Sequence, residues 1–272
     1  MFTLRVIGLV VPLVAGCIGN VQRSARVPHA AVPLNSGQPL GAPAEASAGL
    51  SNVTDVIKPR VGDPSQAVEI PATQMRNELR LRIRDRAQLG FIYEHGFGAT
   101  SQKPDETQAP VGDGDVMGAG MSFGYSIETS TPGLSIGTTV ELMQWSVPYV
   151  EYETCTNCLG NIMVIDHDRA TPMTLGVGVS PSFRRGTVTV FGGAFARNHP
   201  TTQRKSHNVG VIFDEDDGDV KPGTFNVLLH VGVEVELQRW LSALLLINQD
   251  LMAAPVQYGP GIGIALNARL GL

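Results

Sequence analysis

From about residue 78 onward, hydrophobic residues recur at every second position, a period that predicts β-strands rather than helices. In the clearest run, at 116–128, apolar side chains share one face and Gly, Ser and Glu occupy the other. The runs at 225–237 and 262–272 follow the same scheme. The pattern predicts eight strands, at 87–97, 115–128, 134–149, 172–182, 187–197, 224–237, 240–249 and 258–272.

Two further features separate this pattern from that of a soluble β-sandwich, whose strands also alternate. The apolar face is continuous over up to six alternate residues, which at ~3.3 Å per position span roughly 33 Å, more than most soluble strands need. The connections are either tight, as at 129–133 and 183–186, or long and polar, as at 98–114, 150–171 and 198–223. Outer-membrane up-and-down barrels have short periplasmic turns and longer external loops.

The chain therefore resembles small eight-stranded outer-membrane barrel proteins over about 180 residues. The resemblance implies an all-β, antiparallel up-and-down barrel in the bacterial outer membrane. With an even number of strands, such as eight, the amino and carboxyl termini of the barrel domain both lie on the periplasmic side. This placement suits a membrane anchor on that side. One departure is Leu272, because most members of that family end in an aromatic residue.

The amino terminus has the layout of a secretory signal peptide: one positive charge at Arg5, an apolar stretch at 6–13, then small residues. The region that closes it, at 13–17, reads Leu-Val-Ala-Gly-Cys and resembles the bacterial lipoprotein signal, or lipobox. The resemblance implies that Cys17 carries fatty acyl groups such as palmitate and becomes the first residue of the mature lipoprotein. Val14 departs from the family pattern, which usually has Leu three positions before the cysteine.

Composition then divides the rest of the chain. Pro, Ala, Ser and Gly dominate residues 27–49, and such a segment buries too little apolar area to offset its ordering entropy. We therefore predict a signal peptide at 1–16, a disordered lipid-anchored spacer at 17–70 and a barrel domain at 71–272.

The three cysteines are an odd number for an exported protein. If Cys17 carries lipid, Cys155 and Cys158 remain as a pair in an oxidising compartment, and we expect a disulfide between them in a long loop. A redox dithiol would need positive surroundings to lower a thiol pKa, but Glu151 and Glu153 are negative. A structural zinc site would need four ligands, and this pair of cysteines supplies only two.

An arginine-rich stretch opens the strand series. Arginines at 80, 82, 84 and 86 alternate with apolar residues, so either the first strand is unusually long or 78–85 is a separate strand at the mouth. An eight-stranded barrel has an interior just wide enough for side chains, and buried charges there must pair. We predict an inward charge network of Arg80, Arg82, Arg84, Glu128, Glu141, His230, Glu234, Glu236 and Arg269. The alternative is a basic stripe that faces a pore or anionic lipid head groups.

The charged residues argue against nucleic acid as a partner and suggest one candidate calcium site. A net charge of −5 gives no electrostatic footprint for nucleic acid. The acidic run at 214–219 has oxygen ligands suited to Ca²⁺ at Asp214, Asp216, Asp217 and Asp219, where calcium would bridge to anionic lipopolysaccharide. Gly218 comes one position too early for an EF-hand, however, so a solvated loop is the simpler interpretation.

No catalytic motif such as a P-loop, G-x-S-x-G or H-E-x-x-H is present. We expect a non-enzymatic outer-membrane lipoprotein whose long loops bind or shield at the cell envelope, with outer-membrane lipids, lipopolysaccharide or surface ligands as partners. One alternative is a lipid-modifying barrel enzyme that uses His230 and Glu234 as a base and its orienting group. The others are a narrow pore and a soluble periplasmic β-barrel or sandwich that binds a small molecule.

Overall fold

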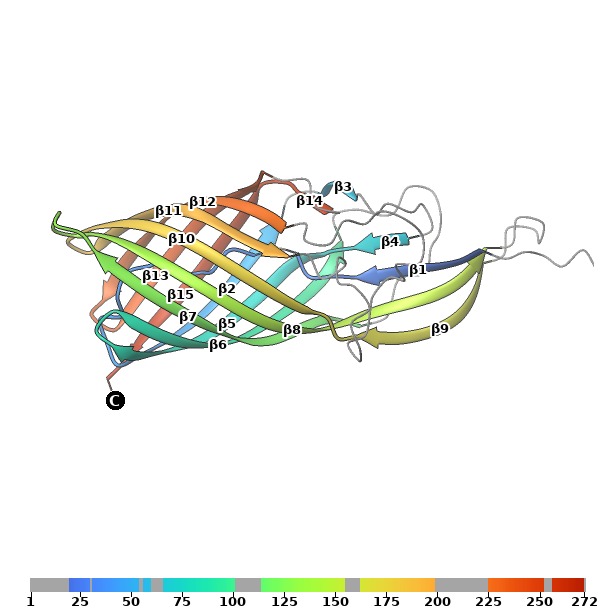
Figure 1. The fold of residues 1–272 in the computed structure, drawn as a ribbon, viewed down its shortest axis with the longest axis horizontal. Helices are drawn as coiled ribbons and strands as arrows, with labels where there is room; N and C mark the ends of the chain where they lie inside the picture. Colours follow the sequence, from blue (N-terminus) through green and yellow to red (C-terminus); the bar gives the residue numbers. More distant parts are fainter. Residues whose placement is uncertain are drawn as a thin grey trace, which may run out of the picture.

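The chain forms a closed antiparallel β-barrel. The structure, a computed structural model, describes residues 20–29, 31–53, 56–59, 66–100, 114–154, 162–198, 225–251 and 256–271. Ten of the strands in this part of the chain follow one another around the wall, and pairing of β8 with β10 completes the ring (Figure 1). They are β2 (Ala44–Val53), β5 (Pro71–Arg84), β6 (Ala87–Thr100), β7 (Val116–Glu128), β8 (Leu134–Thr154), β10 (Met173–Arg185), β11 (Val188–Asn198), β12 (Phe225–Gln238), β13 (Leu241–Asp250) and β15 (Gly261–Leu270).

The barrel has ten strands rather than the predicted eight. All eight predicted strands are present, as β6, β7, β8, β10, β11, β12, β13 and β15. The two additional wall strands are β2 and β5, which precede them in the chain and pair with each other. The arginine-rich stretch is the second half of β5, which is a strand separate from the predicted first strand and begins earlier than residue 78. Sequence analysis missed β2 because its outward row contains mostly Ala and one Leu, which gives little hydrophobic signal.

The two ends of the barrel differ. At one end, tight turns join β5 to β6, β7 to β8, β10 to β11 and β12 to β13, and β2 begins and β15 ends there (Figure 1). Gly186 has a φ of +63° in the β10–β11 turn, a conformation that favours glycine. The opposite end carries the long connections, including those at 54–70, 101–115 and 199–224. We call these the short-turn end and the long-connection end.

Beyond the long-connection end, β8 continues past the barrel wall and supports a small additional sheet (Figure 1). β9 (Ile162–Ala170) and β1 (Asn20–Arg26) both pair antiparallel with this extension of β8, and β4 (Gln66–Glu69) pairs parallel with β1. Tyr152 is buried in the extension, and this burial raises the pKa of its phenol. A separate two-stranded sheet joins β3 (Val56–Pro59) to β14 (Val256–Tyr258).

The apolar rows of the strands face outward, and no second protein layer in the described part of the chain covers them. Large apolar side chains on the wall are about half exposed, for example Phe123 at 47%, Val140 at 45% and Leu142 at 50%. The alternate positions face inward and are Gly, Ser, Thr or charged residues for the most part. A soluble barrel or sandwich has the opposite arrangement, with apolar rows inside, so the structure does not support that alternative. None of the described residues belongs to a helix long and apolar enough to cross a membrane.

Residues 31–43, which we call the plug segment, run through the interior of the barrel and fill it. Leu34 is 2% exposed and lies against two wall glycines, where a Cβ on Gly49 would approach its Cδ1 to 2.3 Å and one on Gly263 its Cδ2 to 2.8 Å. Residues 31–53 lie within the spacer predicted for 17–70, and in the structure they form the plug segment, its junction with the wall and β2. The small residues that made the segment resemble a linker are the ones that fit inside a ten-stranded barrel.

Candidate functional site

The centre of the barrel holds a buried ion-pair cluster built on Arg76. The alternation of β5 turns this side chain inward, where it is almost wholly buried. Its Nη1 lies 2.7 Å from Glu94 of β6, and its Nη2 lies 2.5 Å from Glu141 of β8. Glu78, two residues along β5, lies 3.4 Å from the Nη2 atom of Arg76. Its carboxylate also accepts a hydrogen bond from the Ser122 hydroxyl at 2.8 Å.

Arg197 approaches this cluster from β11, on the other side of the interior. Its Nη2 lies 3.5 Å from Glu94 and 3.7 Å from Glu141, and its guanidinium carbon lies 5.2 Å from the ring centroid of Trp145. The Trp145 indole in turn donates a hydrogen bond to Thr174 at 2.9 Å. The cluster therefore joins four strands, β5, β6, β8 and β11, across the interior of the barrel.

A second set of charges lies nearer the short-turn end. Arg80 forms an ion pair with Glu45 of β2. Arg269 of β15 lies 3.7 Å from Glu45 and 3.0 Å from Glu236, which also contacts Arg184 at 2.7 Å. This set includes the two strands, β2 and β15, whose pairing joins the beginning and end of the barrel wall.

The plug segment is hydrogen-bonded to the wall between Ser36 and Pro43. Ser36 donates to Glu234 at 2.5 Å, and the same carboxylate accepts from Ser242 of β13 at 2.5 Å. Gln38 donates to the Ser182 hydroxyl at 2.9 Å. These contacts supply polar partners for both surfaces, as burial requires.

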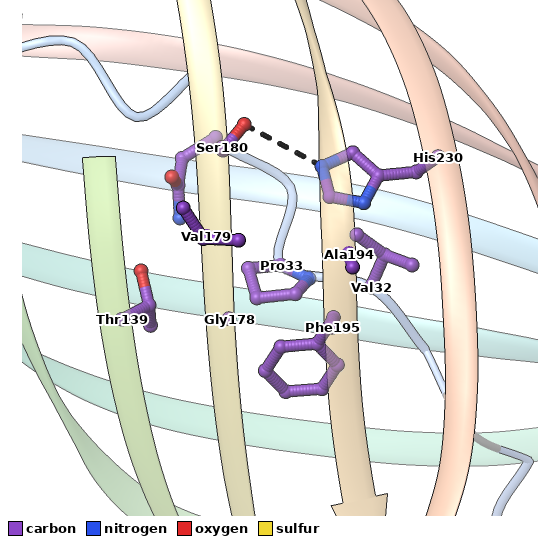
Figure 2. Close-up of a pocket in the computed structure, with 10 residues that line it drawn as sticks. Val32, Pro33, Thr139, Gly178, Val179, Ser180, Ala194, Phe195 and His230 are labelled. Atoms are coloured by element: carbon purple, nitrogen blue, oxygen red, sulfur yellow. Dashed lines mark hydrogen bonds between the residues drawn. The ribbon is translucent and has the colours of Figure 1, made fainter. Parts of the chain in front are cut away.

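A small cavity of ≈ 20 Å³ remains between the plug segment and the wall, about the space of one water molecule. Figure 2 shows its lining, in which Val32 and Pro33 of the plug segment face Ser180, Phe195 and His230 of the wall. The His230 Nε2 atom lies 3.5 Å from the Ser180 hydroxyl oxygen. The cavity is too small for a lipid chain or a small-molecule substrate.

His230 does not pair with Glu234 as the enzyme alternative requires. Both side chains face inward, but residues four apart on a strand are ~13 Å apart along it. Glu234 is instead engaged by Ser36, Ser242 and Asn267.

The structure brings part of the predicted charge network together inside the barrel. Arg80, Glu141, Glu234, Glu236 and Arg269 line the interior or its short-turn end and have ionic or hydrogen-bonding partners there. The remaining predicted charges lie at the short-turn rim. Arg84 is exposed there, Arg82 reaches the Leu40 carbonyl at 3.4 Å, and Glu128 forms an exposed pair with Arg86 at 3.0 Å.

Five residues of the network were not predicted: Arg76, Glu78, Glu94 and Arg197 at its centre, and Glu45 nearer the short-turn end. A usable signal existed for two of them, because Arg76 and Glu78 are in phase with Arg80 on the same strand. The roles of Glu94, Arg197 and Glu45 depend on which strands face each other across the interior, and no local pattern shows this.

Several predicted sites lie outside the described residues, namely Cys17, Cys155, Cys158 and the calcium candidates Asp214, Asp216, Asp217 and Asp219. The acyl group, the disulfide and the calcium site therefore stay predictions. Within the ranges that the structure describes, no group of three or more His, Cys, Asp or Glu side chains is placed to hold a metal ion.

No protein-family model and no curated protein matches this chain. Among solved structures, it is similar to the N-terminal β-barrel domain of Pseudomonas aeruginosa OprF, at 10% identity and a TM-score of 0.35 over 85% of this chain and 99% of that one. It is also similar to the translocator domain of the autotransporter NalP from Neisseria meningitidis, at 8% identity and a TM-score of 0.40 over 85% and 90%. It is similar as well to LpxR from Salmonella typhimurium, at 9% identity and a TM-score of 0.39 over 83% of this chain and 100% of that one.

Proposed function

We propose that this chain is a non-catalytic outer-membrane lipoprotein whose barrel is closed by its own plug segment and whose long connections bind or shield at the cell surface. The observation that carries the proposal is the inverted arrangement of the barrel, which is apolar outside and charged inside. A soluble monomer rarely exposes a contiguous apolar patch larger than a few hundred Å². The rows of exposed Leu, Ile, Val, Met and Phe run over all ten wall strands except β2, where one Leu is exposed.

The apolar exterior of the barrel is suited to contact with the hydrocarbon core of a membrane. A lipid-embedded backbone must satisfy all its hydrogen bonds internally, and a closed barrel does so because it has no free edge. The ring of ten wall strands, closed by the pairing of β8 with β10, meets this requirement. We infer that the apolar exterior contacts membrane lipids and that the barrel lies in a bacterial outer membrane, where closed antiparallel barrels of this kind are found.

The interior supports an anchoring role rather than transport. The plug segment and the Arg76 cluster fill the centre of the barrel, and the cavity beside His230 has room for about one water molecule. A barrel filled in this way is a rigid support for what its ends present. We therefore assign binding or shielding to the long-connection end, with lipopolysaccharide or other surface ligands as candidate partners and outer-membrane lipids around the wall.

Membrane fractionation of a Cys17→Ser variant tests the proposal, because this variant removes the predicted acylation site and leaves the barrel unchanged. We expect the variant to remain with outer membranes after a urea wash that removes peripheral proteins. We also expect it to migrate differently in SDS gels before and after heating, since membrane barrels resist unfolding in cold detergent. Recovery of the variant in the soluble periplasm would overturn the membrane assignment.

Two assays address the competing functions. The purified wild-type protein should give no steady conductance in planar bilayers, and a steady channel would replace the anchoring role with transport. Detergent-solubilised protein should leave the acyl chains of lipopolysaccharide unchanged. Acylation or deacylation that is lost in His230→Ala would favour the enzyme.

A further inference from the structure

The path of the amino-terminal residues links the two ends of the barrel. β1 lies beyond the long-connection end, where Asn20 pairs with Thr154 of the β8 extension. Arg26 donates to the Gly114 carbonyl at 3.1 Å, next to the start of β7, and the Val27 amide donates to Glu69 at 2.9 Å. The chain is therefore still at the long-connection end when it reaches residue 27.

The contacts of the following residues move steadily toward the short-turn end. The His29 ring lies 3.4 Å from Ser51, near the long-connection end of β2. Farther along, a Cβ on Gly37 would lie 3.2 Å from the Cβ of Ser180, about midway down the wall.

At the far end, the Pro43 carbonyl accepts from the Arg82 amide at 2.8 Å, beside the β5–β6 turn. The next residue, Ala44, begins β2 and pairs with Leu270 near the carboxyl end of the chain. The amino-terminal part of the chain thus crosses the whole barrel from inside before it enters the wall.

We propose that the chain threads its own barrel, so that the residues preceding Asn20 are displayed on the outer face of the membrane, together with the acyl group of Cys17. This rests on the proposed function, because the orientation follows from the short periplasmic turns of outer-membrane barrels. Cys17 precedes Asn20 by three residues, which limits the separation to about 10 Å. Sequence analysis expected the anchor on the periplasmic side, where an eight-stranded barrel without a threaded segment would leave it.

Threading also sets the order of assembly. The plug segment leads directly into β2, and β2 is the strand that closes the ring against β15. If the wall closes around the plug segment, the amino terminus never has to pass through a barrel that is already closed.

Three epitope tags test the placement, each in a separate full-length chain expressed in a Gram-negative host. One tag is inserted after residue 19, one in the 199–224 connection and one after residue 272. We expect antibody and protease to reach the first two tags on intact cells and the third only after the outer membrane is permeabilised. An accessible 199–224 tag with a protected tag at 19 would overturn threading while the membrane barrel stands. Reaction of the carboxyl-terminal tag alone on intact cells would overturn outward display, and absence of all three proteins from the membrane fraction would overturn the proposed function itself.

A disulfide cross-link tests threading without tags, in a background that lacks Cys155 and Cys158. The Gly37→Cys and Ser180→Cys pair should form an intramolecular bond, because a Cβ on Gly37 would lie 3.2 Å from the Cβ of Ser180, close to the usual 3.5–4.5 Å of disulfides. Gly37 has a φ of +71°, where a side chain is strained, so Gly37→Ala is measured alongside and must itself stay heat-modifiable. The matched control is Gly37→Cys with Val179→Cys, in which the second cysteine faces outward. The first pair should give a reducible fast-migrating band on denaturing gels and the control none. Equal absence of the band in both, in protein that stays heat-modifiable, would remove the plug segment from the barrel interior.

Discussion

Replacing Arg76 by Met tests whether the ion pairs inside the barrel hold its wall together. Arg76 is 1% exposed, and its guanidinium lies within 2.7 Å of carboxylates on two other strands. Removing one partner of a buried ion pair costs about 3–5 kcal/mol, because the remaining charge stays buried without compensation. Arg197 lies at least 3.5 Å from the same two carboxylates and does not replace the lost contacts. We expect Arg76→Met to lower the free energy of unfolding by about 3–5 kcal/mol or more.

The measurement is urea unfolding in phospholipid vesicles, followed by circular dichroism and by tryptophan fluorescence in a Trp240→Phe background, which leaves Trp145, buried beside the cluster, as the reporter. Arg86→Met is the matched control, since its pair with Glu128 is 47% and 55% exposed and such surface pairs contribute about 0–1 kcal/mol. Adding Glu141→Gln to Arg76→Met removes one of the unpaired charges and should recover part of the loss. An Arg76→Met variant as stable as the control, or a double variant less stable than the single one, would contradict a stabilising role for these ion pairs.

Three further predictions concern the exterior and the plug segment. Leu142→Arg on the middle of the wall should destabilise the barrel in vesicles by about 2–4 kcal/mol, and Leu237→Arg near the short-turn end by about 0–1 kcal/mol; equal costs would contradict a lipid-facing exterior. Replacing residues 20–43 with a short Gly-Ser linker should produce conductance in planar bilayers where the wild type gives none, and a silent variant that is still heat-modifiable would contradict a closing role. Gly137→Ala would bring a Cβ to 2.6 Å from the plug backbone and should lower the yield of the plug-to-wall cross-link, whereas Gly41→Ala, which has 3.9 Å of space, should not.

Most of the barrel wall could be predicted because its outward rows are large and apolar. In β7, β10 and β15 the period of two is uninterrupted, and each strand was located from its own residues. β2 gave no such signal, since its outward residues include Ala46 and Ala48 and its pairing partners lie elsewhere in the chain. The strand count, and with it the width of the barrel, therefore depended on contacts that no local pattern contains.

The interior was predictable in kind but not in detail. Inward charges that must pair follow from alternation and from the cost of burying a lone charge, and Arg80 and Glu141 were found in this way. Their partners were not, because Arg76 meets Glu141 across 65 positions of sequence and only the closed ring brings them together. His230 and Glu234 share a face, but sharing a face of a strand does not imply contact at a spacing of four residues.

The plug segment and the wall are parts of one core. Gly49, Gly137 and Gly263 leave room on the inner wall that Leu34 and the backbone of Gly37 occupy, and a Cβ at any of the three would come within 3 Å of them. Without the plug segment these positions would be voids, and the Glu234 carboxylate would lose the hydrogen bond from Ser36. A segment that can leave easily does not share its polar and apolar contacts with the wall in this way. The closed state is therefore the folded state of this barrel, which supports the proposal that its function resides in what it carries at its ends.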